Sequence, residues 1–231
     1  MCKWQTWMLG LFLMGLGLCQ EGMAQSLTGT TGLVSIPTAE IPEDRSIAFG
    51  VNLVNRAFMD PYLSGQHHGR LYYVSLGYLP FLEVDLRFTR ASNTPPRSVG
   101  DRMVSARLQL VKEQTKLPAL VLGGQDIMGT RKFHALYLVA SKNVHLPRLD
   151  TPLGVHLGYA SKILDAQHHQ FAGLFGGLSF SPAPFLTFML EYDSRHFNGG
   201  LRTVVIEPLA VIVALHDSGT LSGGVSYTLK L

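Results

Sequence analysis

The stretch Leu82-Glu83-Val84-Asp85-Leu86-Arg87-Phe88-Thr89-Arg90 decides the fold of this chain. Apolar side chains alternate along it with charged or polar ones. In a β-strand this period of two places the two sets on opposite faces. The charged face needs water or partner charges, and the apolar face needs lipid or a second protein layer. The stretch therefore predicts a strand of either a soluble sandwich or a transmembrane barrel wall.

The same alternation recurs from residue 45 to the end of the chain and predicts about twelve strands of roughly ten residues. Short turns such as Leu79-Pro80-Phe81 alternate with long polar loops. Strands of soluble sandwiches typically have about five or six residues, whereas about ten suit a tilted membrane crossing. We therefore expect an all-β, antiparallel, up-and-down transmembrane β-barrel over residues 45–231. One turn is expected over residues 126–131, between strands at 117–125 and 132–142.

Residues 1–24 have the features of a secretory signal peptide. Lys3 precedes an apolar run over residues 7–18, and Gly22-Met23-Ala24 offers small residues to a signal peptidase. We expect cleavage after Ala24. Cys19 is not expected to carry a lipid, because Leu18 stands where lipoprotein processing requires a small residue. Residues 25–44 show no sustained periodicity and are predicted to be an N-terminal lead-in segment.

Composition excludes several classes of protein. Both cysteines, Cys2 and Cys19, leave with the signal peptide, so the exported chain cannot depend on disulfides. The formal net charge of +3 is too small to indicate a nucleic-acid partner. No pattern in the sequence predicts a cofactor.

The last strand indicates the location. Alternate residues from position 221 onwards are apolar, aromatic or glycine and share one face: Leu221, Gly223, Val225, Tyr227, Leu229 and Leu231. This pattern resembles the C-terminal signal by which bacterial assembly machinery recognises outer-membrane barrels, although Leu231 replaces the usual Phe. We expect a protein of the bacterial outer membrane, with the barrel-assembly machinery and outer-membrane lipid as partners.

Polar residues on the inner phase of the strands form a candidate lumen polar track. Its members are Glu83, Asp85, Arg87, Arg107, Gln109, Glu191, Asp193 and Arg202. The first interpretation is a mutually neutralising network that fills and stiffens the barrel. The second is a polar track that contacts sugar hydroxyls or a passing solute.

Histidines and serines offer only weak alternatives. The pairs His67-His68 and His168-His169 fall in predicted loops, and adjacent imidazoles on an extended backbone point apart, so no metal site is expected. A hydrolase would need Ser194 or Ser218 beside His196 or His216. No nucleophile motif surrounds these residues, and the prediction is a protein that is not an enzyme, with no catalytic residues.

Four segments carry a family resemblance. They are Thr31-Gly-Leu-Val-Ser-Ile-Pro-Thr-Ala39; Leu117-Pro-Ala119 with Gly123, Asp126 and Gly129-Thr130; Tyr137-Leu-Val-Ala-Ser-Lys142; and Glu191-Tyr-Asp193 with Asn198-Gly-Gly-Leu-Arg202. In this order they resemble the YjbH-type outer-membrane proteins associated with exopolysaccharide and capsule production, whose typical members are longer.

The resemblance implies a barrel connected with polysaccharide secretion or assembly, with polysaccharide or its secretion proteins as further partners. It carries no catalytic residues. A porin-like channel for small solutes, and less so a lipid-modifying hydrolase, are the alternatives.

Overall fold

The computed structural model describes residues 25–56, 58–59, 67–92, 100–131, 133–146, 151–161, 171–217 and 219–231. The predicted signal peptide and the pair His168-His169 lie outside these ranges. Within them, no helix is long and apolar enough to cross a bilayer.

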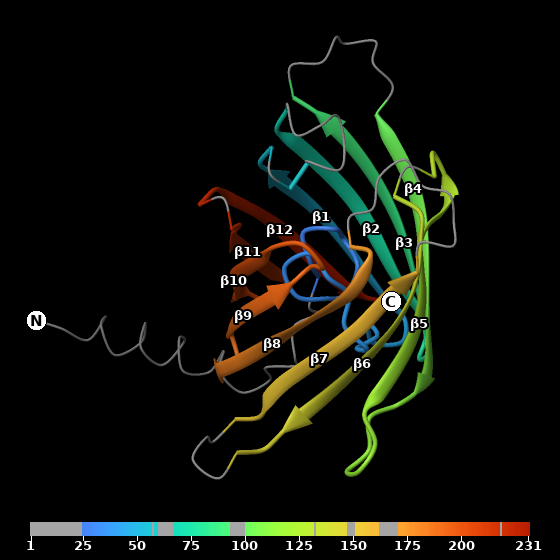
Figure 1. The fold of residues 1–231 in the computed structure, drawn as a ribbon, viewed down its shortest axis with the longest axis vertical. Coiled ribbons are helices and arrows are strands. Elements are labelled where there is room, and N and C mark those ends of the chain that lie inside the picture. Colours follow the sequence, from blue (N-terminus) through green and yellow to red (C-terminus); the bar gives the residue numbers. More distant parts are fainter. Residues whose placement is uncertain are drawn as a thin grey trace, which may run out of the picture.

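The described residues form a closed antiparallel barrel of twelve strands (Figure 1). The strands are β1 (Ser46–Val54), β2 (Gly69–Leu79), β3 (Leu82–Ala91), β4 (Asp101–Val111), β5 (Ala119–Gly129), β6 (Ala135–Val144), β7 (Leu153–Ser161), β8 (Gly173–Ala183), β9 (Leu186–Tyr192), β10 (Phe197–Ile206), β11 (Leu209–Leu215) and β12 (Leu221–Lys230). Each strand pairs with its neighbours in sequence, and β12 closes the barrel against β1. The predicted up-and-down barrel is confirmed.

Successive side chains of β3 point alternately into the barrel and out of it, as in any pleated strand. Glu83, Asp85 and Arg87 point inward and are at most 6% exposed, whereas Leu86 points outward and is 46% exposed. The outward positions of the other strands are also mostly apolar or aromatic, and together they form a continuous apolar belt. A barrel that crosses a bilayer presents such a belt to lipid.

The two rims differ in the length of their connections. At the short-turn rim, two-residue turns join β2 to β3, β8 to β9 and β10 to β11, while seven and eight residues join β4 to β5 and β6 to β7; β1 begins and β12 ends at this rim. Longer connections join β1 to β2, β3 to β4 and β7 to β8 at the opposite, long-loop rim. This asymmetry is typical of outer-membrane barrels.

The turn expected at residues 126–131 is misplaced. Strand β5 continues to Gly129 through a register shift against β4, between Val104 and Ala106. Asp126 takes a left-handed conformation there, with φ of 50°, and its carboxylate accepts the Phe133 N–H at 3.0 Å. A β-bulge inserts an extra residue and disrupts the pairing locally without ending the strand. The turn-like composition of this segment reflects the bulge.

The segment expected to be a lead-in lies inside the barrel. We call residues 25–42 the plug; in Figure 1 it is the blue coil surrounded by the strands. Its backbone folds on itself, with the Leu27 N–H donating to the Val34 carbonyl at 2.8 Å and the Leu33 N–H donating to the Ile36 carbonyl at 3.0 Å. The plug therefore has its own compact structure, held by short-range bonds.

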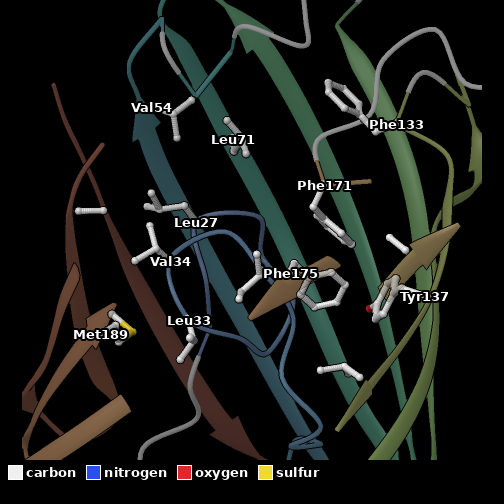
Figure 2. Packing of buried hydrophobic residues seen from close by; sticks show 14 of the residues in the cluster. Leu27, Leu33, Val34, Val54, Leu71, Phe133, Tyr137, Phe171, Phe175 and Met189 are labelled. Carbon is white, nitrogen blue, oxygen red and sulfur yellow. The ribbon is translucent and has the colours of Figure 1, made fainter. Parts of the chain in front are cut away.

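Apolar side chains of the plug and the inner wall form one cluster. Leu27, Val34 and Ile36 are fully buried. Figure 2 shows plug and wall residues side by side: Leu27, Leu33, Val34, Val54, Leu71 and Met189. The Tyr73 ring lies against Gly29 of the plug and Gly50 of β1, at positions where any Cβ would collide with it. The small residues thus let an aromatic ring fill the space between wall and plug.

Candidate functional site

A buried ion pair holds one side of the plug. Glu83 of β3 and Arg107 of β4 lie opposite each other in register, and the Arg107 Nη1 to Glu83 Oε2 distance is 2.5 Å. Glu83 Oε1 accepts the N–H of Thr31 at 2.8 Å and its hydroxyl at 2.9 Å. Arg107 donates to the carbonyls of Thr31 (2.7 Å), Thr38 and Glu40 (2.9 Å). A fully buried pair is tolerated only when its remaining donors and acceptors are bonded, and here the plug backbone supplies most of those bonds.

A carboxylate on the far wall holds the other side. The Glu191 carboxylate of β9 accepts three successive plug N–H groups, from Val34 at 2.9 Å, Ser35 at 2.9 Å and Ile36 at 3.2 Å. It also accepts the Ser35 hydroxyl. Successive N–H groups that converge on one anion form a nest. On β10, Arg202 Nη2 donates to the carbonyls of Gly32 at 2.7 Å and Leu33 at 3.1 Å.

The remaining members of the lumen polar track are less uniform. Arg87 Nη1 reaches the Thr28 carbonyl at 3.4 Å, and its guanidinium lies 5.4 Å from the Phe133 ring centre. Gln109 donates to the Ala39 carbonyl at 3.2 Å. Asp85 is buried, and Asp193 caps the β9–β10 turn by accepting the N–H groups of residues 195 and 196.

Six of the eight track residues thus bond the plug: Glu83, Arg87, Arg107, Gln109, Glu191 and Arg202. The sequence predicted the inward phase of the track residues that lie on strands, whereas Asp193 lies in the connection between β9 and β10. The sequence did not predict that a segment of the same chain would occupy that lumen and take up their hydrogen bonds.

A cavity of about 410 Å³ opens beside the plug at the short-turn rim. Its walls combine hydroxyls, two charged side chains and one aromatic ring: Thr151, Ser179, Ser181, Thr187, Glu40, Arg202 and Phe185. Several hydroxyls with one acid and one base around a concave space suit a polyhydroxylated ligand. We call this cavity the rim pocket. Apart from Arg202, the residues of the rim pocket were not predicted from the sequence. One signal was present, because Thr187 has the inward phase and lies opposite Arg202 in the β9–β10 pair.

The weaker candidates do not assemble into a site. The Ser194 hydroxyl donates to the Leu174 carbonyl at 2.8 Å, while the exposed His196 lies 4.0 Å from Asp193. His216 lies between Asn198 and Ser222. Ser218 is outside the described ranges. Among the residues described, no three His, Cys, Asp or Glu side chains are grouped to hold a metal ion.

Fold and site together define a β-barrel whose lumen is occupied by its own N-terminal segment. The chain belongs to the YjbH family, described as exopolysaccharide biosynthesis protein YbjH, whose family model matches residues 24–229. The resemblance seen in the sequence is confirmed.

One relative and one solved structure extend the comparison. The chain is 28% identical over 214 residues to the "Uncharacterized lipoprotein YjbH" of Escherichia coli (strain K12), a match that covers 76% of this chain and 29% of the relative. The chain thus spans less than a third of that protein's length. A "KdgM porin" superposes with a TM-score of 0.53 at 18% identity, covering 79% of this chain and 98% of the porin. That likeness supports the barrel fold alone.

Proposed function

We propose that this protein is a non-enzymatic outer-membrane barrel that takes part in exopolysaccharide or capsule secretion or assembly. The observation that carries the proposal is the rim pocket, a hydroxyl-lined cavity in a member of an exopolysaccharide-biosynthesis family. In the usual orientation of outer-membrane barrels, short turns face the periplasm. The rim pocket then opens toward the compartment through which a nascent polysaccharide passes.

The proposal includes three partners. The outward belt contacts outer-membrane lipid, β12 is the strand that the barrel-assembly machinery reads, and the rim pocket contacts a sugar chain or a protein that delivers it. A non-enzymatic role is supported by Ser194, whose hydroxyl is bonded to a backbone carbonyl rather than to histidine.

A small-solute channel is the second candidate, because a closed barrel of twelve strands can enclose a pore. The plug counts against it, because many hydrogen bonds from both walls hold the plug in the lumen.

The test is complementation of a deletion strain, with surface polysaccharide measured by glycan staining or composition. Thr187→Phe fills the rim pocket from its inner wall. Thr203→Phe places the same substitution at the next register position but on the outward face of β10, so it serves as the matched control. We expect the Thr187 variant to lose surface glycan while Thr203→Phe and His196→Ala retain it. Normal glycan in the deletion strain, together with open-channel conductance of the purified protein, would instead support the porin function.

A further inference from the structure

Three arginines occupy equivalent places on adjacent strands. Arg70, Arg90 and Arg102 are each the second residue from the long-loop end of β2, β3 and β4. All three are exposed and lie on the outward phase of their strands. They therefore lie where the apolar belt meets the long-loop rim.

The register brings the three charges together. Arg70 is the direct cross-strand partner of Arg90, and Arg102 is the direct partner of Phe88, which puts it diagonal to Arg90. Such pairs have Cβ atoms roughly 5 Å and 7–8 Å apart, and like charges directly opposite each other are destabilising.

None of the ion pairs formed within the described part of the chain involves these arginines. The acidic residues of β3 and the carboxylate of Asp101 on β4 are buried on the lumen side of the wall. Within the described residues the sector thus carries three positive charges without a facing carboxylate, and an external anion can compensate them.

An apolar groove of about 350 Å³ adjoins this cluster on the outer surface. Its walls include Tyr72, Leu86, Phe88, Val104 and Met128, and Arg102 lies among them. The β5 bulge contributes Met128, whose side chain is 65% exposed. An apolar groove of this volume suits part of an acyl chain, with its headgroup at the arginines.

Among the arginines that lie on strands at this rim, the cluster is confined to one sector; the exposed Arg56, Arg131 and Arg195 also lie at the rim, but in the connections and not on a strand. On the other strands the outward residues near the long-loop ends are leucines or aromatics: Leu53, Leu136, Tyr159, Leu174, Tyr192, Phe197, Leu215 and Leu221. Scattered arginines in the connections, such as Arg56, Arg131 and Arg195, suit general anchoring at a membrane interface. Concentration on three neighbouring strands indicates recognition of a discrete group.

We infer that this sector binds a phosphorylated acyl lipid of the leaflet at the long-loop rim. The three guanidinium groups bind its phosphate, since arginine donates in a planar fork that matches phosphate oxygens. An acyl chain lies in the groove between β2 and β5. This site is on the outer wall and is independent of any role of the rim pocket.

Lipid binding to delipidated protein in detergent, measured by native mass spectrometry, tests the inference. The probes are diphosphoryl lipid A, monophosphoryl lipid A and uncharged diacylglycerol. The test variant is Arg70→Gln/Arg90→Gln/Arg102→Gln. The control variant Lys112→Gln/Lys116→Gln/Arg195→Gln removes the same charge from exposed positions elsewhere.

We expect wild type to prefer the diphosphoryl lipid, and the arginine variant to bind it on the order of 100-fold more weakly, as three lost interfacial cations imply. The control variant should bind it as wild type does. Heat-modifiable migration on gels verifies that each variant is folded. The single substitution Arg90→Gln repeats the test with a smaller perturbation of the protein.

Three outcomes would overturn the inference. One is equal binding of the phosphorylated and uncharged lipids. Another is an equal loss in the control variant. The third is complete displacement of the lipid by excess inorganic phosphate, which would assign the arginines to a free anion.

Discussion

At the scale of single residues, one position along a strand decides between the outer surface of the barrel and its lumen. Leu86 and Arg87 are neighbours on β3, yet Leu86 faces outward and Arg87 faces the plug and Phe133. The cost of an arginine on the lipid face of a barrel is about 2–4 kcal/mol near the midplane.

Leu86→Arg should therefore destabilise the barrel by about 2–4 kcal/mol, whereas Arg87→Leu should fold nearly as well. Arg87→Leu loses one long hydrogen bond to the Thr28 carbonyl, a ring contact and the attraction to the buried carboxylates of Asp85 and Asp101, which we expect to be a smaller loss than that of Leu86→Arg. Refolding yield and urea unfolding in lipid vesicles measure the stability of the two variants. Comparable tolerance at the two positions would show that β3 has no lipid face.

The Glu83–Arg107 pair gives a second prediction at this scale. Glu83→Gln leaves Arg107 charged and fully buried, so we expect a loss of about 3–5 kcal/mol in the free energy of unfolding. Lys142→Gln is the control, because it breaks the partly exposed Lys142–Glu113 pair, and such pairs contribute about 0–1 kcal/mol. Equal losses in the two variants, measured by urea unfolding in micelles, would contradict the role given to Glu83.

At the scale of elements, closure depends on β12. This strand pairs with β1 over eight residue pairs and with β11 over seven. Removing it exposes the backbone N–H and C=O groups of both neighbours to hydrocarbon, where no water can bond them.

Deletion of residues 221–231 should thus abolish assembly, seen as loss of heat-modifiable migration and of recovery in the outer-membrane fraction. Lys230→Gln removes only an exposed ion pair with Glu43 at the end of the same strand. It should assemble as wild type does. A deleted chain that still assembled would show that β1 and β11 can close the barrel without β12.

At the scale of the whole molecule, the plug and wall are one folded unit. Hydrogen bonds from β3, β4, β9 and β10 converge on residues 28–40 from both walls. The plug therefore controls how much of the lumen is available to solutes.

In planar bilayers, conductance of the wild-type barrel should be low, and Glu83→Ala/Glu191→Ala should raise it because both anchors of the plug are lost. Glu113→Ala/Asp217→Ala removes two carboxylates from the connections between strands and should leave conductance unchanged. Equal conductance in all three proteins would mean that the plug does not limit passage.

Much of this architecture could be read from the sequence, because alternation is a local property. The alternation of about ten residues is enough to identify the inner and outer faces of a strand. For this reason the approximate strand number, the up-and-down order and the inward phase of Glu83, Arg107, Glu191 and Arg202 were predicted correctly. Residue composition misled at Asp126, because a bulge and a turn favour the same residue types.

The tertiary structure alone decided what fills the barrel. Residues 25–42 have no periodicity, and their key bonds join Thr31 to Glu83 and Ser35 to Glu191, 52 and 156 residues apart. The rim pocket and the arginine cluster depend in the same way on register between strands. The sequence by itself determined the wall of this protein, because alternate residues of a pleated strand are apolar or polar according to the face on which they lie. Only the closed barrel decided the occupant of the lumen, because the groups that bind it meet only after the wall has closed.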